Sequence, residues 1–143
     1  MTDLTPEFQL ATALTNDCFV VGDLPLCRVL LMNDSQYPWF ILVPRRAEIR
    51  EVFQMSASDQ QQFLRESSWL GERLMQHFNG DKLNVAALGN MVPQLHIHHV
   101  VRFRTDPAWP KPVWGASPAV AYATDQADAL ITTVCGWLAG CSL

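Results

Sequence analysis

Short hydrophobic runs in the first third of the chain predict β-strands. The segment "CFVVGDLPLCRVLLMN" (18–33) has two apolar, β-branched-rich runs on either side of Gly22-Asp23, which predicts a β-hairpin or two adjacent strands. The polar segment "NDSQYP" (33–38) has the composition of a turn, and "WFILVP" (39–44) predicts a strand that Pro44 closes. We therefore expect an antiparallel meander over residues 18–44.

The helical period of 3.6 residues is clearest in the middle of the chain. Ser56 lies three residues before Asp59, as in a capping box, and Asn79-Gly80 predicts a left-handed cap at the other end. Between these caps, apolar side chains recur at helical spacing: Phe63, Trp69 or Leu70, Leu74 and Phe78. A long helix over residues 58–78 follows from this pattern.

Two weaker patterns predict a helix near each end of the chain. Thr5-Pro6-Glu7 has the order of an N-cap, a proline in the first turn and an acidic residue. A short amphipathic helix is expected after it, with Phe8, Leu10, Ala11 and Leu14 on its apolar face. Residues 119–138 predict a final helix, although Thr and Val weaken the pattern there.

Two further strands are expected after the long helix, in "KLNVAAL" (82–88) and "QLHIHHVVRF" (94–103), joined by "GNMVP" (89–93). The whole arrangement predicts an α+β fold in one domain, residues 1–143. It would have a five-stranded, mostly antiparallel sheet with a long helix on one face and a C-terminal helix.

Alternation along the last strand divides its side chains between two faces. Gln94, His96, His98, Val100 and Arg102 share one face, and Leu95, Ile97, His99 and Val101 share the other. The second set is mainly apolar and is expected to pack against the long helix. The first set is polar and cationic, so we expect it to line an open face.

Composition and charge narrow the functional classes. Hydrophobic residues make up 49% of the 143 residues and charged residues 17%, which is typical of a compact globular protein. A net charge of −4 argues against a general nucleic-acid binder, because phosphate backbones require a basic surface. With no signal peptide and no long apolar segment, we expect a cytoplasmic protein without a membrane anchor, whose four cysteines are reduced.

The cluster of three histidines at positions 96, 98 and 99 admits two kinds of chemistry. A zinc site on His96 and His98 would need a third ligand, such as His77, a carboxylate or a cysteine. A metal-free reaction at phosphorus needs only a neutral imidazole whose other nitrogen donates a hydrogen bond, with a second histidine beside it. Gln94 and Arg102, on the same face, could then bind phosphoryl oxygens.

"QLHIHHV" resembles the signature of the histidine triad (HIT) nucleotide-binding proteins, His-φ-His-φ-His-φ-φ, where φ is hydrophobic. The order of "LLMNDSQYPWFILVPRR", a capped helix and the histidine strand is also similar, so the resemblance covers residues 20–115. It implies that His98 is the nucleophile and that His96 contacts phosphate. Gln94 departs from the signature, since it replaces the first histidine. His99 occupies a hydrophobic position, and the loop "LGNMVP" is shortened.

The same resemblance suggests roles for three asparagines and for the tail. Asn33 corresponds to a residue near the nucleoside, and Asn84 and Asn90 flank the loop where ribose or phosphate would bind. Each of the three also has a simple structural interpretation, in a turn or in pairing with the backbone. The segment "DPAWPKPVWG" (106–115) would close over the site or reach a dimer partner.

The resemblance therefore implies a hydrolase or transferase that acts at an α-phosphate through a nucleotidyl-histidine, without a cofactor. Its substrates would be small nucleotides, either dinucleoside polyphosphates such as diadenosine tetraphosphate or nucleoside phosphoramidates, and the protein would be a homodimer. Two alternatives remain open. One is a catalytically weak nucleotide-binding module, which the change at Gln94 favours, and the other is a metal-dependent hydrolase.

Overall fold

A five-stranded antiparallel sheet forms the centre of the protein, of which a computed structural model describes residues 6–143. Its strands are β1 (Cys18–Asp23), β2 (Cys27–Met32), β3 (Trp39–Pro44), β4 (Lys82–Ala86) and β5 (Ile97–Arg102). They lie in the order β1-β2-β3-β5-β4, and each neighbouring pair is antiparallel. The predicted α+β class and the meander over residues 18–44 are confirmed.

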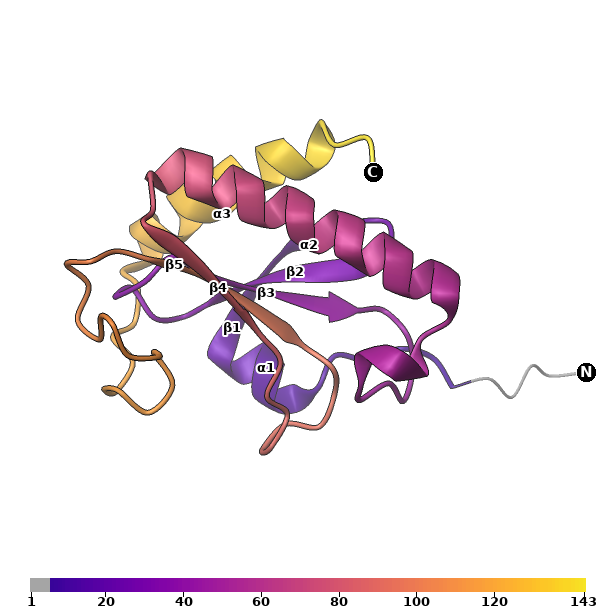
Figure 1. The fold of residues 1–143 in the computed structure, drawn as a ribbon. Coiled ribbons are helices and arrows are strands. Elements are labelled where there is room, and N and C mark those ends of the chain that lie inside the picture. The colour runs from indigo at the N-terminus through magenta and orange to yellow at the C-terminus, as the bar shows by residue number, and fades with distance from the viewer. Residues whose placement is uncertain (1–5) are drawn as a thin grey trace, which may run out of the picture.

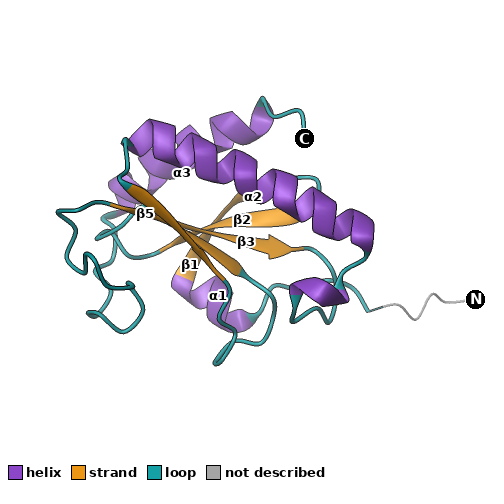
Figure 2. Cartoon of the chain, viewed as in Figure 1, coloured by secondary structure: helices purple, strands orange, loops and turns teal. Residues whose placement is uncertain are grey.

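Helices cover both faces of this sheet (Figures 1 and 2). The long helix α2 (Ala57–Phe78) and the C-terminal helix α3 (Thr124–Ala139) lie on one face, and the short α1 (Thr12–Asp17) lies on the other. A 3-10 turn, η1 (Val52–Gln54), precedes α2. Within residues 6–143, no helix combines the length and the apolar character needed to cross a membrane.

The sheet separates two hydrophobic cores. Phe40 and Leu42 of β3 pack in the core that α2 and α3 cover, whereas Ile41 and Val43 pack in the core beneath α1. Every residue of β3 is buried, which explains why "WFILVP" is apolar throughout instead of alternating. A central strand with two buried faces is thus flanked by β5, which carries the histidines.

Both ends of α2 follow the sequence prediction. The Ser56 hydroxyl accepts a hydrogen bond from the Asp59 amide at 3.1 Å, and Asn79 ends the helix with a φ of 51°. The helix also carries a fully buried carboxylate, Glu66, which the sequence pattern did not reveal. Its oxygens accept hydrogen bonds from the amides of Leu26 and Cys27 at 2.9 and 2.7 Å, so α2 is fixed to the start of β2.

The first hairpin differs from expectation in the position of its turn. Gly22 and Asp23 belong to β1, and the chain reverses over residues 24–26, where the Leu24 amide donates to the Cys27 carbonyl at 2.8 Å. A Cβ atom on Gly22 would lie 2.8 Å from Leu138 Cδ1. The glycine therefore permits the close approach of α3 to β1, where the sequence pattern had suggested a turn.

The N-terminal helix is shorter than predicted and begins at Thr12, and α3 begins at Thr124 instead of near residue 119. Thr5 of the expected cap lies outside the described residues. Residues 9–11 are not helical because the Gln94 side chain bonds to their backbone: the Ala11 amide donates to its Oε1 and its Nε2 donates to the Gln9 carbonyl, both at 2.8 Å. These long-range hydrogen bonds outweigh the local helical preference.

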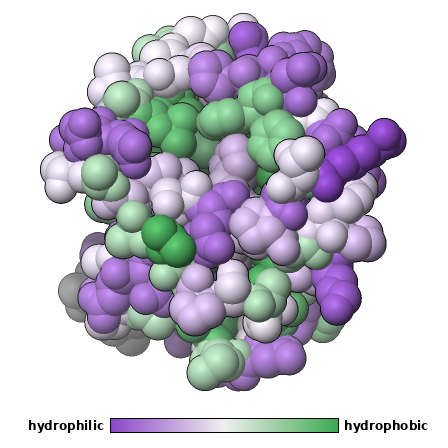
Figure 3. Space-filling model, turned by 90° about the vertical axis from the view of Figure 1, so that its left-hand side faces the viewer, coloured by the Kyte–Doolittle hydropathy of each residue, from purple (hydrophilic) through white to green (hydrophobic). Residues whose placement is uncertain are grey.

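The segment between β5 and α3, residues 103–123, covers the sheet face on which α1 also lies. It is the orange segment at the left of Figure 1, and Ala108 and Val113 bring it into the core beneath α1. Seen from that side, the surface has hydrophobic residues grouped in its upper part with polar residues around them (Figure 3). This segment closes the face that the sequence analysis expected to be open.

Candidate functional site

Three histidines lie at or beside β5, and strand alternation separates them as predicted. His98 is paired with Ile41 of β3 and Ala86 of β4, and the next residue, His99, is paired with Phe40 and Val85. His96 lies just before the strand on the same face as His98, with 5.0 Å between the ring centroids. The assignment of faces is confirmed.

The expectation that this face is open is wrong. His96 is 7% exposed, His98 4% and Arg102 1%. Residues 103–123 and the segment around α1 cover the polar side chains, and long-range contacts of this kind leave no periodic pattern in the sequence.

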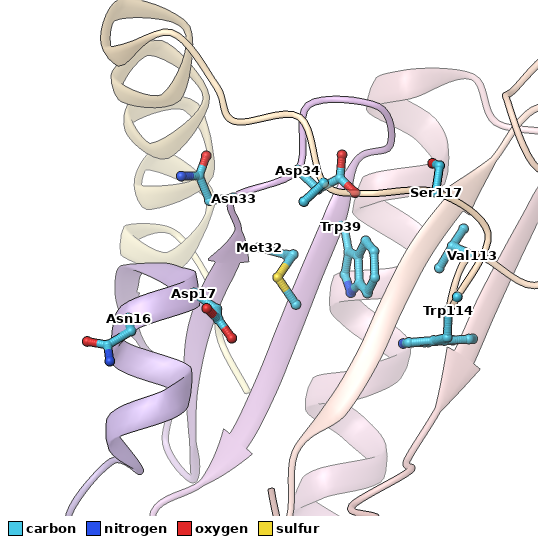
Figure 4. Close-up of a pocket in the computed structure, with 11 residues that line it drawn as sticks. Asn16, Asp17, Met32, Asn33, Asp34, Trp39, Val113, Trp114 and Ser117 are labelled. Carbon is cyan, nitrogen blue, oxygen red and sulfur yellow. The ribbon is translucent and has the colours of Figure 1, made fainter. Parts of the chain in front are cut away.

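A cavity of about 440 Å³ lies between α1, the end of β2 and the segment after β5, and Trp39 and Trp114, which pack against His98, line it. It is lined by Asn16, Asp17, Met32, Asn33, Asp34, Trp39, Val113, Trp114, Gly115, Ser117 and Ala119. Figure 4 shows Asn16 and Asp17 on one side, Trp39 and Trp114 on the other, and Met32 between them. This volume is within the range of small-molecule sites, about 300–1,000 Å³.

The charges of this cavity favour a neutral or cationic group. Asp17 and Asp34 supply carboxylates, and none of the described lining residues is a lysine or an arginine. The Asp34 Oδ1 is held by the amide of Gln36 at 3.1 Å and that of Val120 at 3.4 Å. Phosphate groups would be repelled here, so a phosphorylated ligand would place its uncharged part in the cavity.

His96 has a nitrogen suited to nucleophilic attack. Its Nδ1 lies 2.7 Å from the Gln94 carbonyl oxygen, which can only accept, so Nδ1 carries the proton. In the neutral ring, Nε2 therefore holds the lone pair. His96 also lines a small recess of about 30 Å³ together with Arg50 and Gly89, on the side of the loop before β5.

His98 has the opposite tautomer. The Trp39 Nε1–H can only donate, and it lies 2.9 Å from His98 Nδ1, so Nδ1 must accept and the proton of the neutral ring is on Nε2. Burial, and to a lesser degree the neighbouring His96 and His99, lowers the pKa of His98 to about 3. The ring is therefore neutral at physiological pH and presents an N–H donor at Nε2.

This hydrogen-bond pattern gives the two rings different chemical capacities. A nucleophilic imidazole needs a lone pair toward phosphorus and a donated hydrogen bond from its other nitrogen. His96 meets both conditions, whereas the Nε2 of His98 is occupied by a proton. The structure thus gives His96 a lone pair at Nε2 and His98 an N–H donor at Nε2.

His99 lies on the far side of β5, beneath α2, and is fully buried. Its Nδ1 donates to the Ile97 carbonyl at 3.1 Å, and its Nε2 accepts from the Ser67 hydroxyl at 2.7 Å. Burial lowers the pKa of His99 to about 4. Both ring nitrogens are satisfied, so this histidine connects α2 to the sheet.

The expectation that Gln94 binds phosphate stays a prediction, and in this structure its side chain bonds within the protein. Both ends of its side-chain amide bond to the backbone of residues 9 and 11, as described above. At the same time, the backbone carbonyl oxygen of Gln94 accepts the hydrogen bond from His96 Nδ1. The residue that replaces the first histidine thus fixes the N-terminal segment, and through its backbone carbonyl it orients the His96 ring.

Arg102 and Asn84, for which the sequence analysis expected a role in ligand binding, belong to a hydrogen-bonded network within the protein. Arg102 Nε and one terminal nitrogen donate to the two oxygens of Asp106 at 2.8 and 3.0 Å, and the other terminal nitrogen donates to Asn84 Oδ1 at 2.9 Å. Asp106 also accepts from the amides of Phe103 and Trp109, at 3.0 and 2.8 Å. This buried network anchors residues 103–109 to the sheet and engages the Arg102 guanidinium and the Asn84 Oδ1.

The two other asparagines differ in their surroundings. Asn33 lines the large cavity, with its Oδ1 held by the Tyr122 amide at 2.9 Å. Asn90 is exposed in the loop before β5. The sequence analysis missed Trp39 and Asp34, because a partner 59 positions away and a buried carboxylate have no local signature.

The structure does not bring His77 to the other histidines. Its ring packs against Phe78 and Trp137, with centroid distances of 4.7 and 5.3 Å, at the end of α2. Among residues 6–143, no cluster of three or more His, Cys, Asp or Glu side chains has the geometry to hold a metal ion.

Comparisons with known proteins identify the family. Residues 13–105 match the family model of the HIT domain. A histidine triad protein from Marinobacter aquaeolei is 50% identical, with a TM-score of 0.92 over 96% of this chain and 100% of that chain. One from Bradyrhizobium japonicum is 39% identical, with a TM-score of 0.90 over 93% of this chain and 99% of that chain.

A third histidine triad protein, from Sinorhizobium meliloti, is 38% identical, with a TM-score of 0.87 over 89% of this chain and 94% of that chain. No curated protein matches. The family match spans most of the chain and includes β5 with its histidines, and the solved structures share the same fold over nearly their whole length. The chain is a member of the HIT domain family.

Proposed function

We propose that the protein binds a small nucleotide and transfers or hydrolyses it at the α-phosphate through a covalent intermediate on His96. The observation that carries this proposal is the pair of opposite tautomers: a lone pair on His96 Nε2 and an N–H on His98 Nε2, with 5.0 Å between the rings. One ring can attack phosphorus while the other donates to a phosphoryl oxygen.

The cavity supports a specific orientation of the ligand. Its carboxylates, Asp17 and Asp34, disfavour phosphate, whereas its volume and its two indoles, Trp39 and Trp114, suit a nucleoside. The phosphates would then lie toward His96, where Arg50 and Gly89 line the small recess. In this orientation the α-phosphate would lie between the large cavity and the histidine pair.

The reaction needs only groups that this chain supplies. The Nε2 lone pair of His96 forms a bond to the α-phosphorus, and the bond to the leaving group breaks and gives its electron pair to that group. The Gln94 carbonyl continues to accept from Nδ1, so it stabilises the positive charge that develops on the imidazole. Water or another acceptor then attacks phosphorus and gives its proton to the departed leaving group or to solvent, and the P–N bond breaks with its electron pair returning to Nε2.

The substrate class in this proposal is that of adenylated or guanylated compounds, including dinucleoside polyphosphates such as diadenosine tetraphosphate and nucleoside phosphoramidates. We also propose a homodimer. The edge strand β4 exposes Val85, which is 50% accessible, and α2 exposes Leu64, which is 64% accessible. Apolar side chains on an unpaired edge and on a helix are common where two chains meet.

The test is a turnover assay over a panel of dinucleoside polyphosphates and nucleoside phosphoramidates, with and without a chelator. The wild-type protein is expected to turn over at least one substrate at the same rate in chelator, and His96→Ala is expected to be inactive. Turnover that requires an added metal ion would contradict the proposal.

The alternative is a nucleotide-binding module with little turnover. It is favoured by the positions of Gln94 and Arg102, because both polar side chains expected at the phosphates are bonded elsewhere. Retained binding of a nucleoside monophosphate, together with no turnover over the whole panel, would select this alternative.

A further inference from the structure

We propose that Trp39 is a positioning residue, whose indole N–H keeps the proton of His98 on Nε2 and so directs a hydrogen-bond donor at the phosphoryl group. The inference deepens the proposed function and rests on it for the identity of the ligand. Its structural basis is the 2.9 Å hydrogen bond from Trp39 Nε1 to His98 Nδ1. An indole nitrogen has no lone pair to accept with, so this bond allows only one tautomer of the neutral ring.

Trp39 is well placed to enforce this tautomer. It is the first residue of β3 and is 7% exposed. Its ring packs edge-on against Tyr37, His98 and Trp114, with centroid distances of 6.3, 5.7 and 5.9 Å. A buried indole N–H needs an acceptor, and His98 Nδ1 provides it. The hydrogen bond is therefore held by the packing of both rings.

As a consequence, the two neighbouring imidazoles have different roles, attack by His96 and hydrogen-bond donation by His98. If the proton of His98 were on Nδ1, both His96 and His98 would present lone pairs to an anionic phosphate, which would repel it. With the proton on Nε2, His98 attracts a phosphoryl oxygen and leaves the attack to His96. Positioned donors of this kind act most strongly where water is excluded, and His98 is 4% exposed.

A matched control is present in the same cavity. Trp114 also packs edge-on against His98, at a centroid distance of 5.2 Å, and it also lines the large cavity. However, its Nε1 is buried without a hydrogen-bond partner among the described residues. Trp39→Phe and Trp114→Phe therefore remove similar aromatic bulk, but only the first removes a donor from His98.

The experiment is ¹⁵N NMR of the histidine side chains in the wild-type protein, Trp39→Phe and Trp114→Phe, together with kinetics. We expect wild type and Trp114→Phe to show His98 protonated at Nε2 and unprotonated at Nδ1. In Trp39→Phe, the two nitrogens of His98 should report a mixture of tautomers or the Nδ1–H form. For a substrate that turns over, kcat of Trp39→Phe should fall about three- to tenfold, which corresponds to the usual net contribution of one hydrogen bond.

Protonated Nδ1 in wild-type His98 would overturn the inference, even if Trp39→Phe failed to fold. An unchanged tautomer in folded Trp39→Phe would overturn it as well. The NMR result does not depend on activity. If no substrate is turned over but the tautomers behave as expected, the proposed catalysis fails and the role of Trp39 in fixing His98 stands.

Discussion

The two faces of β5 give neighbouring histidines contrasting environments. His98 contacts two indoles and His96, next to a cavity of about 440 Å³. His99 is sealed beneath α2, with Ser67 and the Ile97 carbonyl on its two nitrogens. Both rings are buried and both pKa values are lowered, to about 3 and about 4.

The contrast shows that burial and a lowered pKa do not by themselves identify a functional histidine. What distinguishes the two faces is what each ring nitrogen can still do. Both nitrogens of His99 are committed within the protein. On the other face, His96 and His98 each use one nitrogen for a protein contact, to the Gln94 carbonyl and to Trp39. Each ring thus has an Nε2 that can serve a ligand.

The largest effect that separates the faces is expected from His96→Ala. Loss of the nucleophile should remove the covalent intermediate and lower turnover by at least about 10³-fold. The measurement is trapping of a labelled nucleotide on the protein, combined with steady-state rates. Stable labelling of folded His96→Ala would show that another residue attacks.

A smaller loss of activity is expected from His98→Ala. This change removes one hydrogen-bond donor to the transition state, which costs about 10²-fold in kcat, and the covalent adduct should still form. It also leaves the buried Trp39 N–H without its acceptor, so the free energy of unfolding should fall by about 1–3 kcal/mol. An adduct that disappears in His98→Ala but persists in His96→Ala would restore the roles implied by the family resemblance.

Lowering the pH should destabilise the protein through His98 on one face of β5 and through His99 on the other. The folded pKa values of His98 and His99, about 3 and about 4, lie below the ordinary value of about 6.5. The unfolded chain therefore binds protons that the folded chain does not. The stabilisation that comes from keeping these two histidines neutral is fully present well above pH 6.5. Below this pH, the free energy of unfolding falls by about 1 kcal/mol per histidine for each pH unit, until the folded pKa is reached.

Urea denaturation between pH 7 and pH 4.5 would measure this loss, with His99→Leu as the matched variant. The variant lacks one of the two titrating rings, so its stability should decrease less steeply with acid. Equal slopes in the two proteins would show that His99 does not titrate on unfolding as expected.

His99→Leu should otherwise affect only stability. It removes the hydrogen bond to Ser67, so the free energy of unfolding near pH 7 should fall by about 1–2 kcal/mol. Ser67→Ala is its control, and the double variant should cost less than the sum of the two single changes, because both remove the same interaction. Loss of nucleotide labelling in folded His99→Leu would contradict the separation of the faces.

The smallest effect is expected from Gln94→Ala, which releases residues 9–11 but keeps the backbone carbonyl that holds His96. Amide exchange at Ala11 should increase, while turnover should change by less than about tenfold. A loss as large as that of His96→Ala would mean that the Gln94 side chain contacts the substrate after all.

Local patterns were sufficient to predict the elements that alternate or repeat. The caps at Ser56 and Asn79, the apolar run of β3 and the facing of the histidines all followed from spacing. The burial of the face that carries His96 and His98 could not be predicted in this way, because it depends on residues 103–123 folding back over the sheet. The partners of Gln94 lie 83 and 85 positions away, and that of Trp39 lies 59 positions away. The Arg102–Asp106 pair is local, and its spacing of four residues was an available but unused signal.

The most direct test of the account is to locate the covalent nucleotide in the wild-type protein. Rapid quenching of a reaction with a labelled substrate, followed by peptide mass spectrometry over residues 94–102, would identify the modified side chain. The account predicts a nucleotide on His96, attached through the Nε2 whose lone pair the structure leaves free. A nucleotide on His98 would contradict it, since that result requires a proton to leave Nε2 and the hydrogen bond from Trp39 to break.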